Sequence, residues 1–455
     1  MTTNPLRIGN GQGFWGDSAS APLTLASQEP YLDYLTLDYL AEASMSIMAI
    51  QKEKDPNVGY ARDFIQMVKA MIPLWQKGSP LKIVTNAGGL NPIKCAEECR
   101  NVLQGELKRP FRIGVVVGDD IFPLCRENPE NPLFDNLEMA DSMIHVHDRL
   151  VTANAYLGAD GIADALKQGA DIVITGRVAD PSLTVGPCIA HFGWALTDYE
   201  KLAGATIAGH LIECGTQVTG GISTHWLKIP MGDSIGFPIA EVSADGSCIV
   251  TKPEKTGGEV STQTVKEQLL YEIGDPDRYL SPDVTVSFLS LEVEEIGRNR
   301  VRITGAKGKP PPLTYKVSST YRDGYRVEAM LTIFGQEAPL KARRAAEMLL
   351  NRCRAAGYPP QRSSIECLGD GAVVPGVITS KESVKECVLR MGLADRKQET
   401  LEFFAKEVYS LVTSGPQGTT GYMTGRPHIR EVFAYWPCLV ERNLVQPTIQ
   451  ILEVL

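Results

Sequence analysis

The feature that most constrains the fold is an alternation of short apolar runs and helix-like segments between residue 6 and about residue 230. The runs are rich in β-branched residues and end in glycine, asparagine or aspartate. They lie at 6–9, 34–37, 81–85, 112–117, 150–153 and 171–175, with helical stretches at 39–49, 63–77, 93–104 and 161–168. Strand and helix repeated in this way predict parallel βαβ units. Runs that are apolar without alternation, such as 172–174, are typical of strands buried on both faces.

The sequence therefore predicts an α/β fold with a parallel sheet. We expect an open, doubly wound sheet, and a closed barrel is the alternative because a single sequence does not give the strand order. Near residue 240 the pattern changes to alternating strands, followed by a long helix over 339–356 that Gly357 ends. A chain of 455 residues is too long for one core. We expect an α/β domain at 1–240, which carries the glycine-rich strand-end loops, and a smaller α+β domain at 241–455.

Charge and cysteine content restrict the partners and the compartment. The formal net charge is −9, and nucleic acids and anionic membranes both require a basic face. The sequence contains no secretory signal and no apolar stretch of the roughly 20 residues that span a bilayer. The ten cysteines form no C-x-x-C motif, which favours reduced thiols in the cytoplasm. A small anionic metabolite remains a suitable ligand, because it needs only a few donors at one site.

The first predicted strand ends in a glycine-rich loop. Residues 11–16 (GQGFWG) match the dinucleotide motif G-x-G-x-x-G, and Asp38 follows the second strand. A true fingerprint opens directly into a helix, whereas the residues after this loop delay any helix, so NAD(P) is disfavoured. We expect the backbone of Asn10 and Gly11 to line a different small-molecule site, with Asp17 as a candidate catalytic carboxylate. The alternative is a loop that only packs.

A second loop follows the third predicted strand. Gly88 and Gly89 permit close backbone approach, and Asn86 offers both a donor and an acceptor. These three residues are candidates for substrate binding. A plain turn between strand and helix is the alternative.

Two further loops follow the fifth and sixth predicted strands and carry Asn154, Tyr156, Arg177 and Asp180. An arginine at the carboxyl edge of a parallel sheet is suited to hold a carboxylate or a phosphate. All four residues are candidates for substrate binding. The alternative is that Arg177 and Asp180 only stabilise their own loop.

The segment 209–215 (GHLIECG) is the most specific cluster. In a helix, His210, Glu213 and Cys214 share one face, and Gly215 is typical of a residue that ends a helix. A thiolate at that end faces the negative end of the helix dipole, which raises its pKa. We therefore favour His210 and Glu213 as acid, base or metal ligands over Cys214 as a nucleophile. A buried helix end with a hydrogen-bonded histidine is the alternative.

Metal binding stays open at this stage. A divalent metal at His210 and Glu213 is one option. His145 and His147 form a second candidate pair, but their polar neighbours favour a solvated turn.

Several segments closely resemble the acyclic terpene utilisation family (AtuA-like), long classed as a family of unknown function. They include 86–92 (NAGGLNP), 154–158 (NAYLG), 169–183 (GADIVITGRVADPSL), 208–215 (AGHLIECG) and 279–284 (YLSPDV). The resemblance covers nearly the whole chain. It implies a place in pathways that degrade acyclic terpenoids such as citronellol and geraniol through acyl-CoA intermediates, and it does not imply a particular step.

The candidate residues and the family resemblance together predict an enzyme that acts on a small carboxylate or an acyl-CoA by hydratase, lyase or hydrolase chemistry. Arg177 would anchor the anion, His210 and Glu213 would move protons, and Asn86 and Asn154 would orient the substrate. The first alternative is a non-catalytic accessory or scaffold subunit of an acyl-CoA degradation pathway. A weaker one is an NAD(P)-dependent oxidoreductase. A homo-oligomer is compatible with either.

Overall fold

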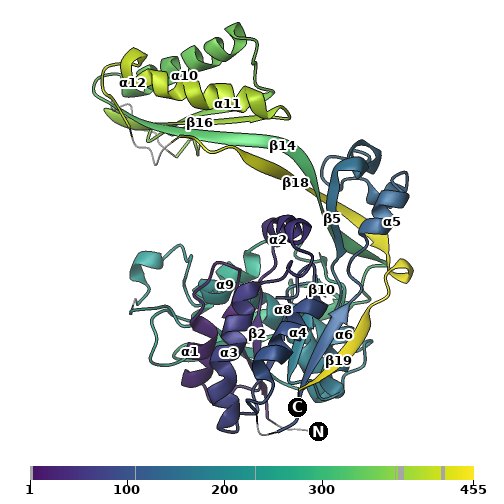
Figure 1. Cartoon of the computed structure of the whole chain (residues 1–455). Coiled ribbons are helices and arrows are strands. Elements are labelled where there is room, and N and C mark those ends of the chain that lie inside the picture. Colours follow the sequence, from purple (N-terminus) through teal and green to yellow (C-terminus); the bar gives the residue numbers. More distant parts are fainter. Residues whose placement is uncertain are drawn as a thin grey trace. The chain divides into compact units, whose positions relative to one another are not determined.

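The computed structural model describes residues 4–107, 109–230, 232–374, 376–377, 384–421 and 426–454. Packing divides the chain into two compact units, one formed by the residues up to 320 together with those from 435 onward, the other by 321–434 (Figure 1). Residue 240, where the sequence predicts a domain boundary, lies within a strand of the first unit. The two units are defined by packing alone. In the described ranges, no helix is both long and apolar enough to cross a membrane.

Within the described residues, the first unit is built on an open, ten-stranded mixed sheet. Its strands in order are β11 (Glu292–Gly297), β12 (Arg300–Thr304), β8 (Cys248–Thr251), β7 (Ile239–Val242), β1 (Leu6–Gln12), β2 (Tyr34–Leu37), β3 (Lys82–Thr85), β6 (Ile172–Thr175), β4 (Phe111–Val117) and β19 (Thr448–Val454). The central pairs β1–β2, β2–β3, β3–β6 and β6–β4 are parallel, and the outer pairs are antiparallel. The part of the chain that the structure describes thus forms a mixed sheet and no closed barrel.

The fifth predicted strand does not join this sheet. It forms β5 (Leu150–Ala155), which pairs instead with β14 (Thr314–Phe334). The hydroxyls of Thr152 and Thr320 share a buried 2.7 Å hydrogen bond between the two strands. A βαβ pattern does not reveal this pairing, because the partner strand lies more than 150 residues further along the chain.

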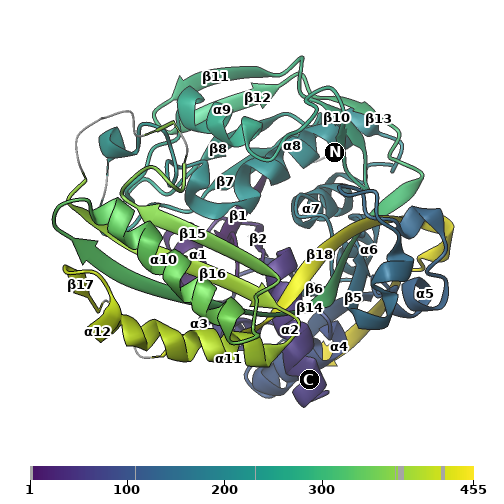
Figure 2. The same cartoon turned by 90° about the horizontal axis from the view of Figure 1, so that it is seen from above.

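Helices cover both faces of the sheet (Figure 2). The helices of the first unit are α1 (Ala21–Gln28), α2 (Glu42–Lys54), α3 (Arg62–Gln76), α4 (Pro92–Leu103), α5 (Phe122–Glu127), α6 (Asp160–Lys167), α7 (Ser182–Phe192), α8 (Tyr199–Glu213) and α9 (Thr262–Leu270). Leu35 and Ile174 pack with Phe64 of α3 in one core, while Tyr34 lies near Cys188 of α7 on the other face. Each fully buried large apolar side chain contributes roughly 1.5–3 kcal/mol. Burial on both faces explains why these strands are apolar without alternation.

A small sheet of β13 (Lys307–Lys309), β10 (Thr285–Ser287) and β9 (Tyr279–Leu280) completes the first unit. The second unit holds α10 (Ala338–Ala355), α11 (Gln398–Glu407), α12 (Leu411–Ser414), β15 (Arg362–Leu368), β16 (Glu386–Asp395) and β17 (Thr419–Thr420). Strands β14 and β18 (Arg430–Glu441) each contribute to both units. Every second residue of β16 is buried, and Leu389, Met391 and Leu393 pack in one core with α10, the long helix predicted from the sequence.

Candidate functional site

A cavity of about 700 Å³ lies in the first unit, where loops that follow β1, β2 and β6 meet the end of α8. The carboxyl ends of parallel strands meet at one edge of a sheet, which is the usual place for a ligand site in such folds. Five of the predicted site residues line this cavity: Asp17, Tyr156, Arg177, Asp180 and Glu213. They come from four separate segments of the sequence.

The loop after β1 is fastened to the end of α8. Asn10 Nδ2 donates to the backbone carbonyl of Glu213 at 3.0 Å, and Asn10 Oδ1 accepts from the backbone amide of Gln12. Asp17 Oδ2 accepts from the amide of Gly13 at 2.7 Å and holds the loop closed. Asn10 and Gly11 themselves are buried behind the cavity wall. A Cβ on Gly11 would lie 2.8 Å from the backbone of α1, so this glycine serves close packing.

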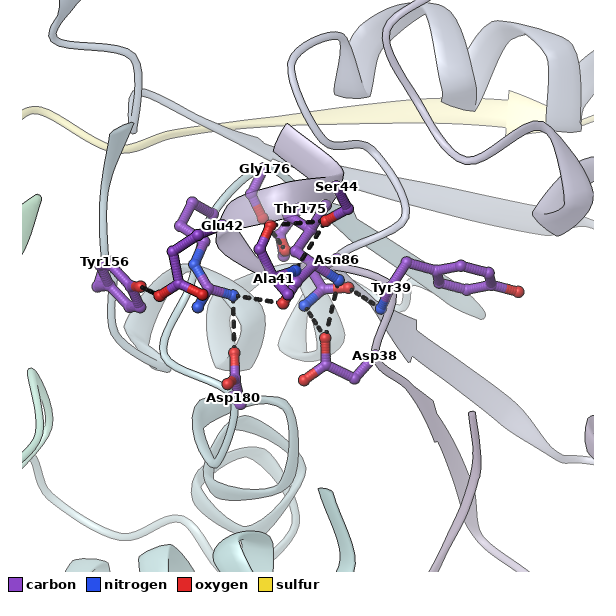
Figure 3. A network of polar contacts seen from close by, with 12 residues as sticks. Asp38, Tyr39, Ala41, Glu42, Ser44, Asn86, Tyr156, Thr175, Gly176 and Asp180 are labelled. Atoms are coloured by element: carbon purple, nitrogen blue, oxygen red, sulfur yellow. Dashed lines mark hydrogen bonds and ion pairs between the residues drawn. The ribbon is translucent and has the colours of Figure 1, made fainter. Parts of the chain in front are cut away.

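The loop after β3 supports the site from behind. Asn86 is fully buried, donates to Asp38 Oδ1 at 2.6 Å and accepts from the amide of Tyr39 at 2.7 Å (Figure 3). Gly88 and Gly89 are also absent from the cavity wall. A Cβ on Gly88 would lie 2.5 Å from a backbone oxygen of β6, and Gly89 has a positive φ of 51°. Asn86 thus holds Asp38 in place, while the two glycines permit close packing of the loop.

Asn154 takes part in a different network. Its amide donates to Asp119 Oδ2 at 2.8 Å, and the same oxygen accepts from the backbone amide of Arg177 at 2.8 Å. Burial raises the pKa of Asp119 to about 6. Asn154 lines a separate cavity of about 220 Å³ rather than the larger one. Its geometry fixes the start of the Arg177 loop.

Arg177 and Lys316 place two positive charges against Tyr156. The guanidinium of Arg177 lies 4.1 Å from the centre of the tyrosine ring, and Lys316 Nζ lies 5.2 Å from it. Arg177 is only 3% exposed, and its Nη1 donates to Asp180 Oδ1 at 2.7 Å and to a backbone carbonyl at 3.1 Å. In the described part of the chain, the Lys316 ammonium has no hydrogen bond and no ion pair. Figure 3 shows the tyrosine hydroxyl donating to Glu42, at 3.0 Å.

Four charged residues that line the cavity are missing from the predicted set: Asp38, Glu42, Glu272 and Lys316. Asp38 enters the sequence argument only through the spacing of the dinucleotide motif, and Glu42 lies within the helical stretch predicted at 39–49. A lone lysine in strand β14 gives no signal at all, because its position depends on the unforeseen pairing with β5. The backbone carbonyl of Lys316 accepts from the amide of Tyr156 at 2.9 Å, and this bond brings the two side chains together.

Burial controls the charge of the cavity carboxyls. It raises the pKa of Asp38 well above its ordinary value, and the negative charge of Asp180 raises it further. Burial also raises the pKa of Asp180, although Arg177 opposes the shift. Glu42 behaves differently, because a backbone hydrogen bond and the charge of Arg177 outweigh its burial and lower its pKa. The cavity therefore combines one carboxyl with a lowered pKa, Glu42, with carboxyls whose pKa values are raised.

His210 and Glu213 form a buried pair at the end of α8. His210 Nδ1 lies 2.9 Å from Glu213 Oε1, and His210 Nε2 lies 2.9 Å from the carbonyl of Gln268. A carbonyl only accepts, so Nε2 carries a hydrogen, and one proton is shared between Nδ1 and Oε1. Burial raises the pKa of Glu213 to about 7, with His210 opposing. Burial lowers the pKa of His210, but the hydrogen bond and charge of Glu213 raise it above its ordinary value.

Only Glu213 of this pair borders the cavity; His210 lies behind it and is 1% exposed. Glu213 Oε2 is buried without a hydrogen-bond partner among the described residues. Such an oxygen costs free energy unless it is protonated or meets a ligand. The pair therefore presents one titratable group to the cavity with a second, hidden group behind it.

The helix end has the predicted form. Helix α8 stops at Glu213, and Gly215 follows with a positive φ of 57°. Burial raises the pKa of the Cys214 thiol, and the charge of Glu213 adds to the shift. A thiol of this kind is a poor nucleophile at neutral pH.

The predicted metal candidates are not assembled into a cluster. Within the described ranges, no group of three or more His, Cys, Asp or Glu side chains is arranged to hold a metal ion. His145 Nδ1 is bonded to Asp141 at 2.6 Å and His147 Nδ1 to a backbone carbonyl at 2.8 Å, both on an exposed turn.

Comparisons with known proteins match nearly the whole chain to a family model. A comparison with curated proteins and a comparison with solved structures each found no match. The model of the acyclic terpene utilisation family protein AtuA matches residues 6–451, nearly the full length. The match includes every segment that forms the cavity. The chain belongs to the acyclic terpene utilisation family, AtuA.

Proposed function

We propose that the chain is an enzyme that transfers protons on a small carboxylate or acyl thioester, by hydratase or lyase chemistry at the 700 Å³ cavity. The observation that carries the proposal is Glu213, a carboxyl at the cavity wall whose pKa is raised to about 7. A general acid or base is most effective when its pKa lies near the working pH. Membership of the family supports a role in acyclic terpene utilisation.

His210 would act as a positioning residue and a proton store. Its Nε2–H is held by the carbonyl of Gln268, so its Nδ1 always faces Glu213. The proton shared by the pair can lie on Nδ1, which leaves Glu213 as a carboxylate that takes one proton on Oε2 and later returns it, so the pair gains and loses one proton in each cycle. This arrangement keeps Glu213 oriented toward the cavity through a full cycle of proton uptake and release.

Lys316 and Arg177 would bind the charged or polarised end of the substrate. Arg177 already pairs with Asp180, whereas Lys316 has no ion pair among the described residues, so Lys316 is the cation free to meet an oxygen of the substrate. A cavity of about 700 Å³ has the size of ordinary small-molecule sites. An enolate oxygen that forms during proton transfer would be stabilised by a nearby fixed positive charge.

In the direction of hydration, the Glu213 carboxylate takes a proton from water while the water oxygen bonds to Cβ of an α,β-unsaturated acyl group. The electron pair of the double bond moves through Cα to the carbonyl oxygen. The proton then returns from Glu213 to Cα, which restores the carboxylate and completes the addition. The reverse sequence is a lyase reaction with loss of water.

The test is an assay with short, branched α,β-unsaturated acyl-CoA thioesters and their free acids. Hydration is followed by loss of the ultraviolet absorbance of the conjugated thioester, and exchange at Cα is followed by NMR in D₂O. Glu213→Gln should reduce turnover by about 10²–10⁴-fold, the usual contribution of a general acid or base. Asp283→Asn is the matched control, because Asp283 is also a buried carboxyl with a raised pKa, of about 6, but it does not line the cavity. Equal rates for the two variants, or no reaction and no exchange with any of these compounds, would overturn the proposal.

A further inference from the structure

A second cavity, of about 800 Å³, lies in the first unit beside β1, β8 and β12. Its wall is dominated by cationic side chains, with two carboxylates, Glu29 and Glu254. The five cations are Arg7, Lys252, Lys255, Arg298 and Arg300. None of these residues borders the cavity that holds Glu213.

Two of the cations are neutralised by carboxylates. Arg7 pairs with Glu29 at 3.1 Å and approaches Glu241 at 3.4 Å. Arg300 donates to both oxygens of Glu241, at 2.5 and 3.3 Å. The five cations carry five positive charges, and Glu29, Glu254 and Glu241 together carry three negative charges. Two positive charges therefore remain uncompensated.

The remaining three cations have no carboxylate partner in the described part of the chain. Arg298 and Lys255 are exposed, and their side chains make no hydrogen bond or ion pair there. Lys252 is only 4% exposed, and its ammonium is held by Thr256, at 2.9 Å to the carbonyl and 3.2 Å to the hydroxyl. Burial lowers the pKa of Lys252, and the nearby charge of Arg298 lowers it further. Like charges placed together in this way are unfavourable until an anion joins them.

The local backbone fixes this arrangement. Arg298 and Asn299 form the turn between β11 and β12, with Asn299 in the left-handed region at φ 52°. Asn299 Oδ1 accepts from the amide of Val260 at 3.0 Å, which anchors the turn and leaves the amide nitrogen of Asn299 as an additional donor at the cavity. The backbone of this turn is therefore positioned in advance of any ligand, which reduces the entropic cost of ordering it on binding.

We propose that this second cavity binds a phosphate-bearing anion with at least two negative charges, such as a diphosphate group or the phosphates of a nucleotide. The guanidinium of arginine and the ammonium of lysine are the side chains that bind phosphate oxygens most effectively. The excess of two positive charges matches a dianion. It arises in a chain of net charge −9, so it is a local feature of the cavity rather than a consequence of overall composition.

The experiment measures binding by isothermal titration calorimetry with pyrophosphate, inorganic phosphate, ADP, coenzyme A and succinate as probes. The test variant is Lys255→Ala/Arg298→Ala, because among the described residues these two side chains make no hydrogen bond or ion pair that the substitutions would remove. The control variant, Arg278→Ala/Arg302→Ala, also removes two exposed positive charges but lies outside the cavity. Wild type and control should bind pyrophosphate or ADP more tightly than succinate. The test variant should bind at least about tenfold more weakly, the effect of roughly 1.4 kcal/mol.

The probes distinguish the source of the phosphate. Tighter binding of ADP or coenzyme A than of pyrophosphate would identify a nucleotide, and equal binding would identify the diphosphate group alone; both outcomes support the site. Absence of binding by wild type with every phosphate probe, or equal weakening in the test and control variants, would overturn it. Glu213→Gln should bind these probes like wild type, so the result is independent of the proposed reaction.

Discussion

Replacing Glu213 by glutamine should change how the stability of the protein depends on pH. The ordinary pKa of this carboxyl is 4.5, and burial raises it to about 7 in the folded chain. The difference corresponds to about 3 kcal/mol between the protonated and ionised forms. Because the side chain is 9% exposed, solvent screening reduces this value little.

The direction follows from proton binding. A carboxyl with a raised pKa binds its proton more tightly in the folded state, so folding is favoured at low pH and loses stability as pH rises from 4.5 to about 7. The raised pKa of His210 acts in the same direction, with its contribution lost as pH rises through that pKa. In Glu213→Gln the carboxyl is gone, and His210 loses the hydrogen bond and the negative charge of Glu213 that oppose the effect of burial on its pKa. Both changes reduce the amount by which the free energy of unfolding falls as pH rises.

The assay is urea unfolding of wild type and variant at several pH values between 5 and 8. At pH 5 the variant should be the less stable protein, because it loses a hydrogen bond that contributes roughly 1 kcal/mol. By pH 8 the difference between the two should have moved in favour of the variant by about 3 kcal/mol. The free energies of unfolding at each pH give this double difference directly.

Glu267→Gln is the control. Hydrogen bonds to Thr224 and Gln263 outweigh the burial of Glu267 and lower its pKa to about 2, so its titration is complete below pH 5. Its difference from wild type should stay constant between pH 5 and pH 8. If Glu213→Gln also ran parallel to wild type over that range, the assignment of a proton-holding Glu213 would be wrong.

Three further changes test the architecture of the site. Arg177→Met leaves a carboxylate without its buried partner and should lower the free energy of unfolding by about 3 kcal/mol, measured in urea at pH 7; a loss below about 1 kcal/mol would place this pair with ordinary surface ion pairs. Gly13→Ala would put a Cβ 2.7 Å from the backbone carbon of Cys214 and should lower the thermal midpoint, at a cost of about 1–3 kcal/mol, whereas Gly274→Ala meets no neighbour and should not. Lys316→Met should lower kcat/KM for an anionic substrate by at least about tenfold, because the lysine is proposed both to bind the substrate and to stabilise the enolate oxygen, and an unchanged kcat/KM in steady-state kinetics would contradict this role.

The centre of the fold could be predicted because its signals are local. The run 172–175 is β-branched and apolar, and such a segment is stable only as a strand buried on both faces. Residues after β1 and β6 were expected to meet because parallel strands end at one edge, and Asp17, Arg177 and Asp180 do line one cavity. The end of α8 was equally local, since Gly215 takes the left-handed conformation that suits glycine.

The roles of the other site residues could not be predicted, because they depend on partners that are distant in the sequence. Asn86 and Asn154 have the chemistry of substrate-binding residues, but their amides are taken by Asp38 and Asp119. Nothing near either asparagine in the sequence identifies those carboxylates as neighbours. Lys316 is even harder to predict from the sequence, because its place in the cavity wall follows from the pairing between β5 and β14.

The proposed reaction also explains why the cavity needs buried carboxyls. Ionised aspartate and glutamate around the cavity would repel a carboxylate or an enolate, and one lysine would not compensate for them. Burial raises the pKa of Asp38, Asp180 and Glu213, which reduces the negative charge that these groups place around an arriving anion. The same desolvation raises the pKa of Glu213 to about 7, close to the pH at which proton transfer is most effective.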